Sequence, residues 1–598
     1  MSETAILEAK QEELPKSAGS TQPFRWILPF SVIGLTLGAY VGTVRFRFVF
    51  DDHGQIIGNS YVQFWRHVPK YFISQVWANI FPRQAGNYYR PLFLLWLRIN
   101  DALFGFNPHG WHAAALLLHV ISTILVYFLF RKLIARPEVA AFGALVFGLH
   151  PIHAEVVAWI SGATESLLAV FFLAAFLAYL KSREGNAAIW MTLSCVLFAL
   201  AVFSKEAGIV LPALVFCHAW IYGSSSTGGR RGFGPGLTRG VRAALPYAPL
   251  GVFYLIVRHS VLHGFGHASI HLGWRTDLFT MPSMMAFYLK KWFLPIRLTE
   301  FYDLPYLSGW NFWHFFLPAL CIVGVGVALW FERRQLGEKE VAFASLWMLI
   351  PMLPVLYASV FPPHDIVHDR YFYLPSVGAS LVVALAVQRL TIRGAALTSA
   401  EPAPAFLLAF LAFGATLAVL ASHEASFWRD DITMFSRAHT LAPLNPVARN
   451  DYGVELASLG YDDAARAVFH EAIQADSKDW AAYFNLGRIA YEEGNYADAE
   501  YWLRQANIMN HNAPDVYVDL GLTDLRTNRL GEALGNMRTA VELRPNDPNY
   551  LFAYGVVLAQ SGDCTSAEAQ LRAALEIRPN EGMTQLVLHE CEMADSHK

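Results

Sequence analysis

Charged residues are scarce in this chain. Asp, Glu, Lys and Arg make up 16% of the 598 residues, whereas hydrophobic residues make up 55% and the mean hydropathy is +0.32. Soluble domains carry about a quarter charged residues, so the composition excludes an ordinary soluble protein. Neither half of the chain has the basic surface that nucleic-acid binding requires. The composition therefore predicts a membrane protein.

Cysteine is also rare. Five cysteines are too few for a disulfide scaffold. Cys195, Cys217 and Cys321 fall in apolar runs and are expected to be packing residues. Cys564 and Cys591 lie near the C-terminal end, where a bridge would require an oxidising compartment. The sequence leaves open whether these two are paired.

The N-terminal residues lack the basic start and apolar run of a cleavable signal. Residues 1–25 are therefore expected to be a cytoplasmic tail. Apolar runs near 20 residues indicate helical membrane spans. About eleven are predicted, near residues 26–45, 112–130, 139–151, 164–180, 187–204, 207–222, 243–260, 312–331, 341–360, 371–390 and 404–421.

Basic clusters between these runs predict the topology. With a cytoplasmic N-terminus, every cluster falls on the cytoplasmic side, as the positive-inside rule requires. The Gly/Ser/Arg-rich stretch 223–240 is then a flexible cytoplasmic loop, and eleven spans place the C-terminus outside. An error of one span would move the C-terminal region into the cytoplasm.

The C-terminal region repeats with a period of 34 residues. Gly453, Gly487, Gly521 and Gly555 are each 34 residues apart, and alanines recur twelve and nineteen residues after each. This period, with small residues at fixed offsets, is typical of tetratricopeptide repeats, in which helix pairs stack into a solenoid. Residues 428–444 continue the register upstream as a half-repeat, and residues 581–594 are expected to form a capping helix.

The repeats are strongly acidic. Residues 445–598 hold 12 Lys and Arg against 24 Asp and Glu, whereas the rest of the chain holds 33 against 24. An acidic solenoid favours extended peptides that are basic or hydroxyl-rich. The array is expected to present an acceptor protein; docking of an assembly partner is the alternative.

Polar residues of the membrane region gather on the predicted outer side. Such residues at the membrane interface are costly and usually functional. The candidates are Asp51, Asp52, Arg90, His150, His153, Glu155, Glu165, Lys205, Glu206, Lys290, Lys291 and Arg370.

Several of these residues lie in runs that resemble a known family. The runs are Phe50-Asp-Asp-His53, the turn Tyr89-Arg-Pro91, the stretch His150-Pro-Ile-His153-Ala-Glu155 through Ile160-Ser-Gly162, Ser204-Lys-Glu206, and Asp369-Arg-Tyr-Phe-Tyr-Leu-Pro375. In this order they are similar to the transmembrane and tetratricopeptide-repeat O-mannosyltransferases, and we expect a bacterial-type member. Bacterial relatives often carry a basic pair and an acid after the Ile-Ser-Gly run, whereas this chain has Ala163-Thr164-Glu165.

The resemblance implies an all-α polytopic GT-C glycosyltransferase region at residues 26–422 and a periplasmic or lumenal repeat region at residues 423–598. It implies a polyprenyl-phosphate sugar donor, expected to carry mannose, and a Ser or Thr hydroxyl of an exported protein as acceptor. An acid in the first outer loop, Asp51 or Asp52, is then the catalytic base. No cofactor and no metal are expected. The membrane is expected to be the bacterial inner membrane or its equivalent.

Physical chemistry agrees with that mechanism. A hydroxyl needs a positioned base, and a partly desolvated carboxylate serves as one. Direct attack with one base predicts inversion at the sugar carbon. The phosphate leaving group needs stabilisation by cations. The candidates are Arg90, Lys205, Lys290, Lys291 and Arg370.

Structural roles remain open for the same residues. Asp51, Asp52 and Glu165 are also suited to helix capping. Lys290, Lys291 and Arg370 are suited to the membrane interface. His150 and His153 are spaced unlike a zinc-binding helix pair, and Pro151 interrupts the helix between them. Two other functions also remain: sugar transfer to a lipid or glycan, and a non-enzymatic scaffold for envelope assembly.

Overall fold

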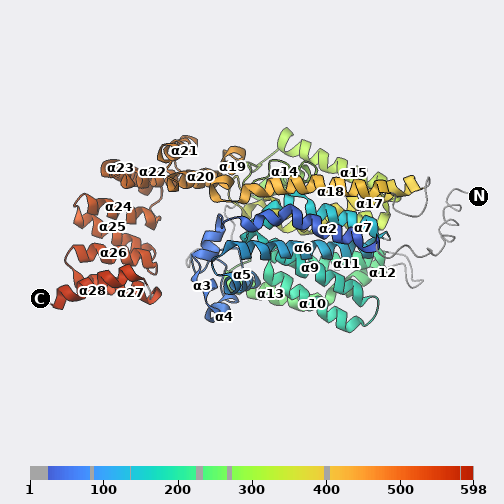
Figure 1. Ribbon diagram of the computed structural model, residues 1–598, viewed down its shortest axis with the longest axis horizontal. Helices are drawn as coiled ribbons and strands as arrows, with labels where there is room; N and C mark the ends of the chain where they lie inside the picture. Colours follow the sequence, from blue (N-terminus) through green and yellow to red (C-terminus); the bar gives the residue numbers. More distant parts are fainter. Residues whose placement is uncertain are drawn as a thin grey trace, which may run out of the picture. The chain divides into compact units, whose positions relative to one another are not determined.

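The computed structural model describes residues 24–80, 86–134, 136–223, 233–265, 272–395, 404–578 and 581–596. All regular elements in these ranges are helical (Figure 1), which confirms the all-α class. The chain divides into two units, Met1–Arg437 and Ala438–Lys598. Most of the predicted tail and part of the predicted loop 223–240 lie outside the described residues.

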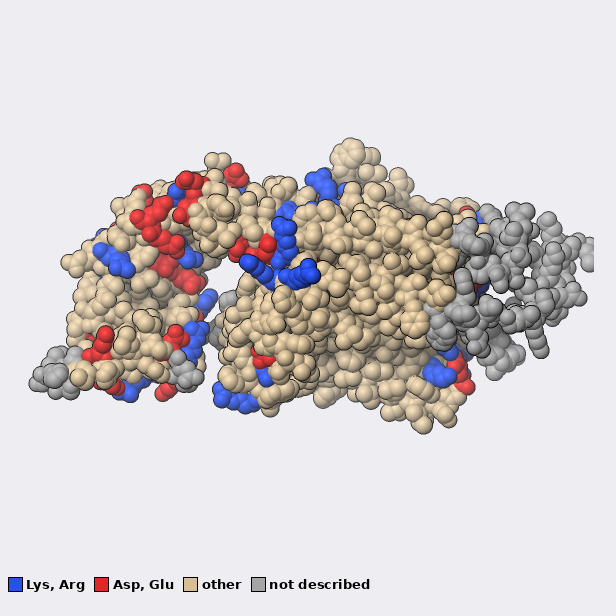
Figure 2. Space-filling model, in the orientation of Figure 1, with Lys and Arg blue, Asp and Glu red and all other residues tan. Residues whose placement is uncertain are grey.

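The first unit holds helices of varied length, and the last of them continues past Arg437 into the second unit. They are α2 (Phe24–Tyr40), α5 (Pro91–Phe104), α6 (Pro108–Leu133), α7 (Pro137–Leu149), α8 (Ala154–Ala158), α9 (Thr164–Ser182), α10 (Ala187–Ser204), α11 (Leu211–Tyr222), α12 (Phe233–Ala244), α13 (Ala248–Leu262), α14 (Trp274–Phe293), α15 (Leu317–Leu336), α16 (Glu338–Leu349), α17 (Ser376–Ala395), α18 (Pro404–Ala425) and α19 (Asp431–Leu441). Helix α6 packs against α7 and α9, and α9 packs against α10. On the face drawn in Figure 2, a broad band of this unit carries neither acidic nor basic side chains.

Length and composition support fewer membrane spans than predicted. Among the described residues, eight helices are long and apolar enough to cross a membrane, or nine if a bent pair counts as one. Two predicted spans, 207–222 and 371–390, correspond to the shorter apolar helices Glu206–Tyr222 and Ser376–Leu390. The second begins late because Asp369–Phe372 forms a separate 3-10 turn.

The bent pair is the predicted span 139–151. Helices α7 and Pro151–Ala158 meet at 48°. The break follows from Pro151, which has no N–H for a helical hydrogen bond. The ring of His150 accepts a hydrogen bond from the backbone of Ile152 (3.3 Å) and so caps the new turn. The predicted span thus ends at His150, and the chain turns toward the polar end of the unit.

The second unit is a stack of helix pairs. They are α20 (Pro446–Ser458), α21 (Asp462–Ala475), α22 (Trp480–Glu492), α23 (Tyr496–Met509), α24 (Pro514–Arg526), α25 (Leu530–Leu543), α26 (Pro548–Gln560), α27 (Cys564–Ile577) and α28 (Gly582–Ser596). The repeated glycines allow the paired helices to approach closely: a Cβ at Gly487 would lie 2.7 Å from Cγ of Leu503. Cys564 and Cys591 are both buried and unbridged.

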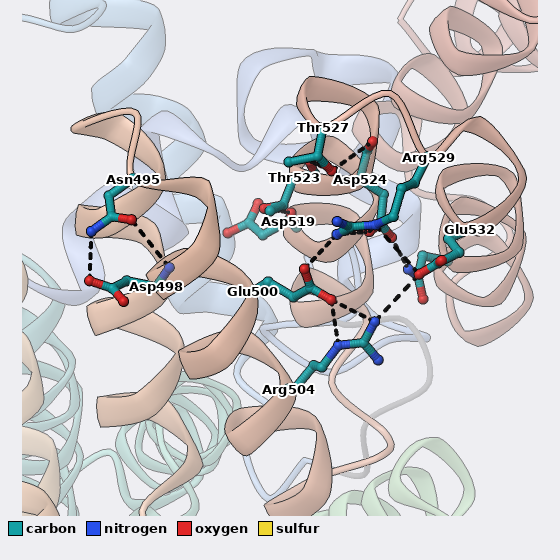
Figure 3. A network of polar contacts seen from close by, with 11 residues as sticks. Asn495, Asp498, Glu500, Arg504, Asp519, Thr523, Asp524, Thr527, Arg529 and Glu532 are labelled. Carbon is teal, nitrogen blue, oxygen red and sulfur yellow. Dashed lines mark hydrogen bonds and ion pairs between the residues drawn. The ribbon is translucent and has the colours of Figure 1, made fainter.

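Polar contacts join successive repeats. Arg529, at the start of α25, donates hydrogen bonds to Asp524 on α24 and to Glu500 on α23, both at 2.6 Å (Figure 3). Arg504 donates to the same Glu500 (2.8 Å). Asp524 is only 1% exposed and also accepts from Asn536 (2.8 Å). This network fixes the angle between neighbouring helix pairs.

Candidate active site

The two adjacent acids Asp51 and Asp52, which follow α2 in the chain, lie in different surroundings. Asp52 is 0% exposed, and its carboxylate accepts hydrogen bonds from the backbone and hydroxyl of Ser161 (2.9 and 2.6 Å) and from the backbone of Val49 (3.3 Å). Burial raises the pKa of Asp52 to about 6, although these hydrogen bonds lower it. Asp51 accepts a hydrogen bond from Gln55 (3.3 Å) and faces open space.

Two cavities meet at Asp51. The smaller has a volume of about 60 Å³, and we call it the cationic cavity because it contains three basic residues. It is lined by Asp51, Gln55, Val76, Trp77, Tyr88, Arg90, Phe93, Trp159, Ser161, Thr164, Lys205, Arg370 and Tyr371. The larger has a volume of about 360 Å³, and we call it the acidic cavity. It is lined by Phe50, Asp51, Gln75, Trp77, Gly86, Asn87, Tyr88, Trp159, Glu300, Phe301, Val360, Phe361, Pro362, Asp365, His368, Arg370 and Tyr371.

Each cation of the cationic cavity is held by an acid behind it. Arg90 donates two hydrogen bonds to Glu206 (3.1 and 2.7 Å). Lys205 is paired with Glu165. Such pairing offsets the cost of burying the charges and fixes where the cations point.

Arg370 is held from two directions. Its guanidinium contacts Glu155 on α8 and donates to Glu300 (2.8 and 3.0 Å), and its backbone N–H also donates to Glu155 (3.0 Å). The rings of Trp159 and Tyr371 lie 5.1 and 5.0 Å from the guanidinium carbon. These contacts hold Arg370 at the wall that the two cavities share.

The remaining predicted residues do not line the cavities. His150 stacks on Trp292 with ring centroids 4.0 Å apart, and His153 lies 3.0 Å from the hydroxyl of Ser376. Lys290 is exposed on α14, and Lys291 donates to backbone carbonyls, including that of Arg297 (2.9 Å). Among the described residues, no three His, Cys, Asp or Glu side chains are placed to hold a metal ion.

The sequence interpretation missed several lining residues. Glu300 brings an acid into the larger cavity, and Tyr88 and Trp159 supply aromatic walls. Tyr88 and Trp159 lie beside or within the family-like runs, which was a usable signal. Glu300 follows a polar Arg-Leu-Thr stretch in an aromatic segment and had no such signal.

The fold and the cavities define an integral membrane protein with a polar site at one end of its helices and a separate helical repeat region. Residues 89–227 match the family model described as dolichyl-phosphate-mannose-protein mannosyltransferase. Residues 454–514 and 518–581 match the model described as tetratricopeptide repeat.

Curated relatives match most of this chain. Protein O-mannosyl-transferase Tmtc3 of Drosophila melanogaster is 24% identical over 91% of this chain and 66% of its own length. Protein O-mannosyl-transferase TMTC3 of Homo sapiens is 22% identical over 88% and 61%, and human TMTC4 is 26% identical over 70% and 62%. This chain thus spans slightly less than two thirds of the length of these relatives. The chain is thus similar to the protein O-mannosyl-transferases of the TMTC group, and its segment that matches the mannosyltransferase model precedes the tetratricopeptide repeats.

Two solved structures of tetratricopeptide-repeat proteins are similar to part of this chain. YrrB, a TPR protein, is 22% identical, covering 27% of this chain and 84% of its own, with a TM-score of 0.24. TTC0263, a thermophilic TPR protein of Thermus thermophilus, is 19% identical, covering 31% and 97%, with a TM-score of 0.25.

Proposed function

We propose that this chain is a membrane O-mannosyltransferase that moves mannose from a polyprenyl phosphate to Ser or Thr hydroxyls of exported proteins. The observation that carries the proposal is the position of Asp51, which lines both cavities. Cations lie on one side of Asp51, and a larger space lies on the other. A donor phosphate fits the first cavity, and an acceptor segment fits the second.

Asp51 is the base in this proposal. The acceptor oxygen attacks the anomeric carbon as its proton moves to Asp51. The bond from that carbon to the phosphate oxygen breaks, and its electron pair stays on the phosphate. Arg90, Lys205 and Arg370 stabilise the charge that develops there. Because one attack displaces one leaving group, the configuration at the sugar carbon inverts.

Asp52 has a supporting role. Its carboxylate is buried and already accepts three hydrogen bonds from Ser161 and Val49. It joins the first outer loop to the start of α9 and so orients the neighbouring Asp51. Glu155, Glu165 and Glu206 likewise orient the three cations rather than contact the substrate.

The cavities open on the non-cytoplasmic side in this proposal. Helix α9 begins at Thr164, in the cationic cavity, and ends near Lys181, which shares Glu184 with Lys132. Its 19 residues separate the two ends by roughly 28 Å. The positive-inside rule places the basic end in the cytoplasm. A cysteine at Glu184 should react with a membrane-impermeant maleimide only after permeabilisation, and one at Pro362 in intact cells.

The repeat region recruits the acceptor protein in this proposal. Its helix pairs form a regular array, and the region is strongly acidic. Concave solenoid surfaces bind extended segments, so an exported chain can be held near the membrane while its hydroxyls are modified.

The deciding experiment compares Asp51→Asn with Asp52→Asn in purified protein, using mannosyl-phospho-polyprenol and a Ser/Thr peptide. Asp51→Asn should lower kcat at least about a hundredfold without changing the unfolding temperature. Asp52→Asn should lower the unfolding temperature, because a buried acceptor of three hydrogen bonds is weakened. Asp303→Asn, an equal charge change outside the cavity linings, is the control. Full activity in Asp51→Asn would reject Asp51 as the base.

A further inference from the structure

Asp365 differs from the other acids that line the acidic cavity. Asp51 accepts a hydrogen bond from Gln55, and Glu300 accepts two from Arg370. Among the described residues, no donor reaches the carboxylate of Asp365 within hydrogen-bond distance, and its Oδ1 is buried without a partner. A buried carboxylate oxygen without a hydrogen-bond donor is costly unless a ligand supplies one.

The neighbouring His368 does not donate a hydrogen bond to Asp365. Nδ1 of His368 lies 3.0 Å from the backbone carbonyl of Glu300, so Nδ1 must carry the proton that it donates. In a neutral ring, Nε2 then presents a lone pair to Oδ1 of Asp365, 3.5 Å away. Burial lowers the pKa of His368, which keeps the ring neutral. Two acceptors therefore face each other, and Oδ1 of Asp365 lacks a hydrogen-bond donor.

The charge balance of the acidic cavity also favours a positively charged ligand. Asp51, Glu300 and Asp365 are lining acids, whereas Arg370 is the lining cation in the part of the chain that is described. Arg370 is already engaged by Glu155 and Glu300. The space is thus net negative and available to a cation.

The walls of the cavity suit an organic cation. The rings of Trp77, Tyr88, Trp159, Phe301 and Phe361 line the space beside Asp365. Aromatic faces attract ammonium and guanidinium groups and also pack against their aliphatic stems. A small hydrated metal ion would gain little from such walls, whereas a lysine or arginine side chain would gain from both features.

We propose that the acidic cavity selects acceptor segments in which a Lys or Arg lies close to the modified Ser or Thr, with Asp365 as the partner of the basic side chain. The inference rests on the proposed function, since it assigns the larger cavity to the acceptor. It names a sequence class of acceptor that the reaction itself does not require. The basic group anchors the segment while the hydroxyl reaches Asp51.

The experiment measures kcat/KM for three peptides that differ only beside one acceptor serine, where they carry lysine, norleucine or glutamate. The wild-type protein should prefer the lysine peptide to the norleucine peptide by about tenfold, as expected for a desolvated ion pair. Asp365→Asn should bring this ratio to about one. Asp303→Asn, with the same charge change outside the cavity linings, should keep the ratio.

Asp365→Glu is a second variant for this experiment, and it keeps the negative charge. Its carboxylate reaches one methylene further, so the preferred side chain should shift from lysine toward ornithine. A wild-type ratio near one overturns the inference, and so does an Asp365→Asn protein that keeps the preference or an Asp365→Glu protein whose preference does not move. Wild-type protein that turns over none of the peptides would instead reject the proposed function.

Discussion

At the scale of single residues, the neighbouring acids Asp51 and Asp52 lie in different surroundings. Asp52 lies against Ser161, 109 positions away in sequence, whereas Asp51 faces the cavities. The local sequence identified the pair of acids but not which of the two is buried, since the burial of Asp52 depends on that distant contact. The same holds for Asp365, whose isolation depends on the ring orientation of His368.

The selectivity for basic acceptors should depend on pH. Burial raises the pKa of Asp365 to about 6, with Glu300 and Glu155 raising it further and His368 and Arg370 lowering it. An acid with a raised pKa is ionised above that value and becomes neutral as the pH falls through it. The lysine-to-norleucine ratio of kcat/KM should therefore be full at pH 7.5 and decline below about pH 6.

The lysine-to-norleucine ratio of kcat/KM separates the titration of Asp365 from that of the proposed base, because both peptides need Asp51 equally. Measuring it at intervals from about pH 5 to 8 tests the prediction. Asp365→Asn should give a flat profile near one. A wild-type ratio that stays constant across this range would assign the selectivity to another group.

At the scale of elements, the turn that carries Asp51 is anchored by the start of α19. Oδ1 of Asp431 accepts the backbone N–H of Phe50 (2.8 Å), and Oδ2 lies 2.8 Å from Nε2 of His53. Phe50 has a φ of 53°, a left-handed conformation that is costly for a residue with a side chain. The two contacts hold this turn on either side of Asp51.

Asp431→Ala should therefore lower kcat by roughly ten- to a hundredfold, since a small displacement of a base costs that much. The unfolding temperature should change little. Asp430→Ala is the matched control, because Asp430 accepts the backbone N–H of Thr433 (3.0 Å) and so caps α19 itself. Steady-state kinetics and thermal unfolding of both variants provide the comparison. Equal kinetics for the two variants would contradict a positioning role for Asp431.

Elements differ in how much of them the sequence predicts. Apolar runs located the long helices, and the 34-residue period located the repeat pairs, because both patterns are local. The separation of Arg370 from the following helix was not predictable in this way. It follows from Glu155, 215 positions earlier, which accepts the backbone N–H of Arg370 and holds the 3-10 turn. The predicted phosphate ligands Lys290 and Lys291 illustrate the same limit, since their helix presents them away from the cavity linings.

At the scale of the whole molecule, apolar helices and charged repeats lie in different parts of the chain. Charge is sparse in the spans and concentrated in the repeats, where inter-repeat pairs such as Arg529–Glu500 carry part of it. A solenoid is stabilised by contacts between neighbouring repeats, so a local defect propagates along the array without reaching a separate unit. If the repeats recruit the acceptor as proposed, this separation allows recruitment to be altered independently of chemistry.

Gly487→Ala should show that independence. The new Cβ would lie 2.7 Å from Cγ and 3.2 Å from the backbone N of Leu503, and a backbone neighbour cannot move aside cheaply. Overpacking should destabilise the repeats by about 1–3 kcal/mol, more than the gain from replacing glycine in a helix. Gly535→Ala is the control, because its Cβ meets nothing within 4 Å and should leave the array as stable or stabilise it. Gly487→Ala should raise KM for a long acceptor protein and speed proteolysis of the repeats, while kcat/KM for a short peptide stays at the wild-type value. Equal loss for long and short acceptors would mean that the repeats support the catalytic unit rather than recruit its substrate.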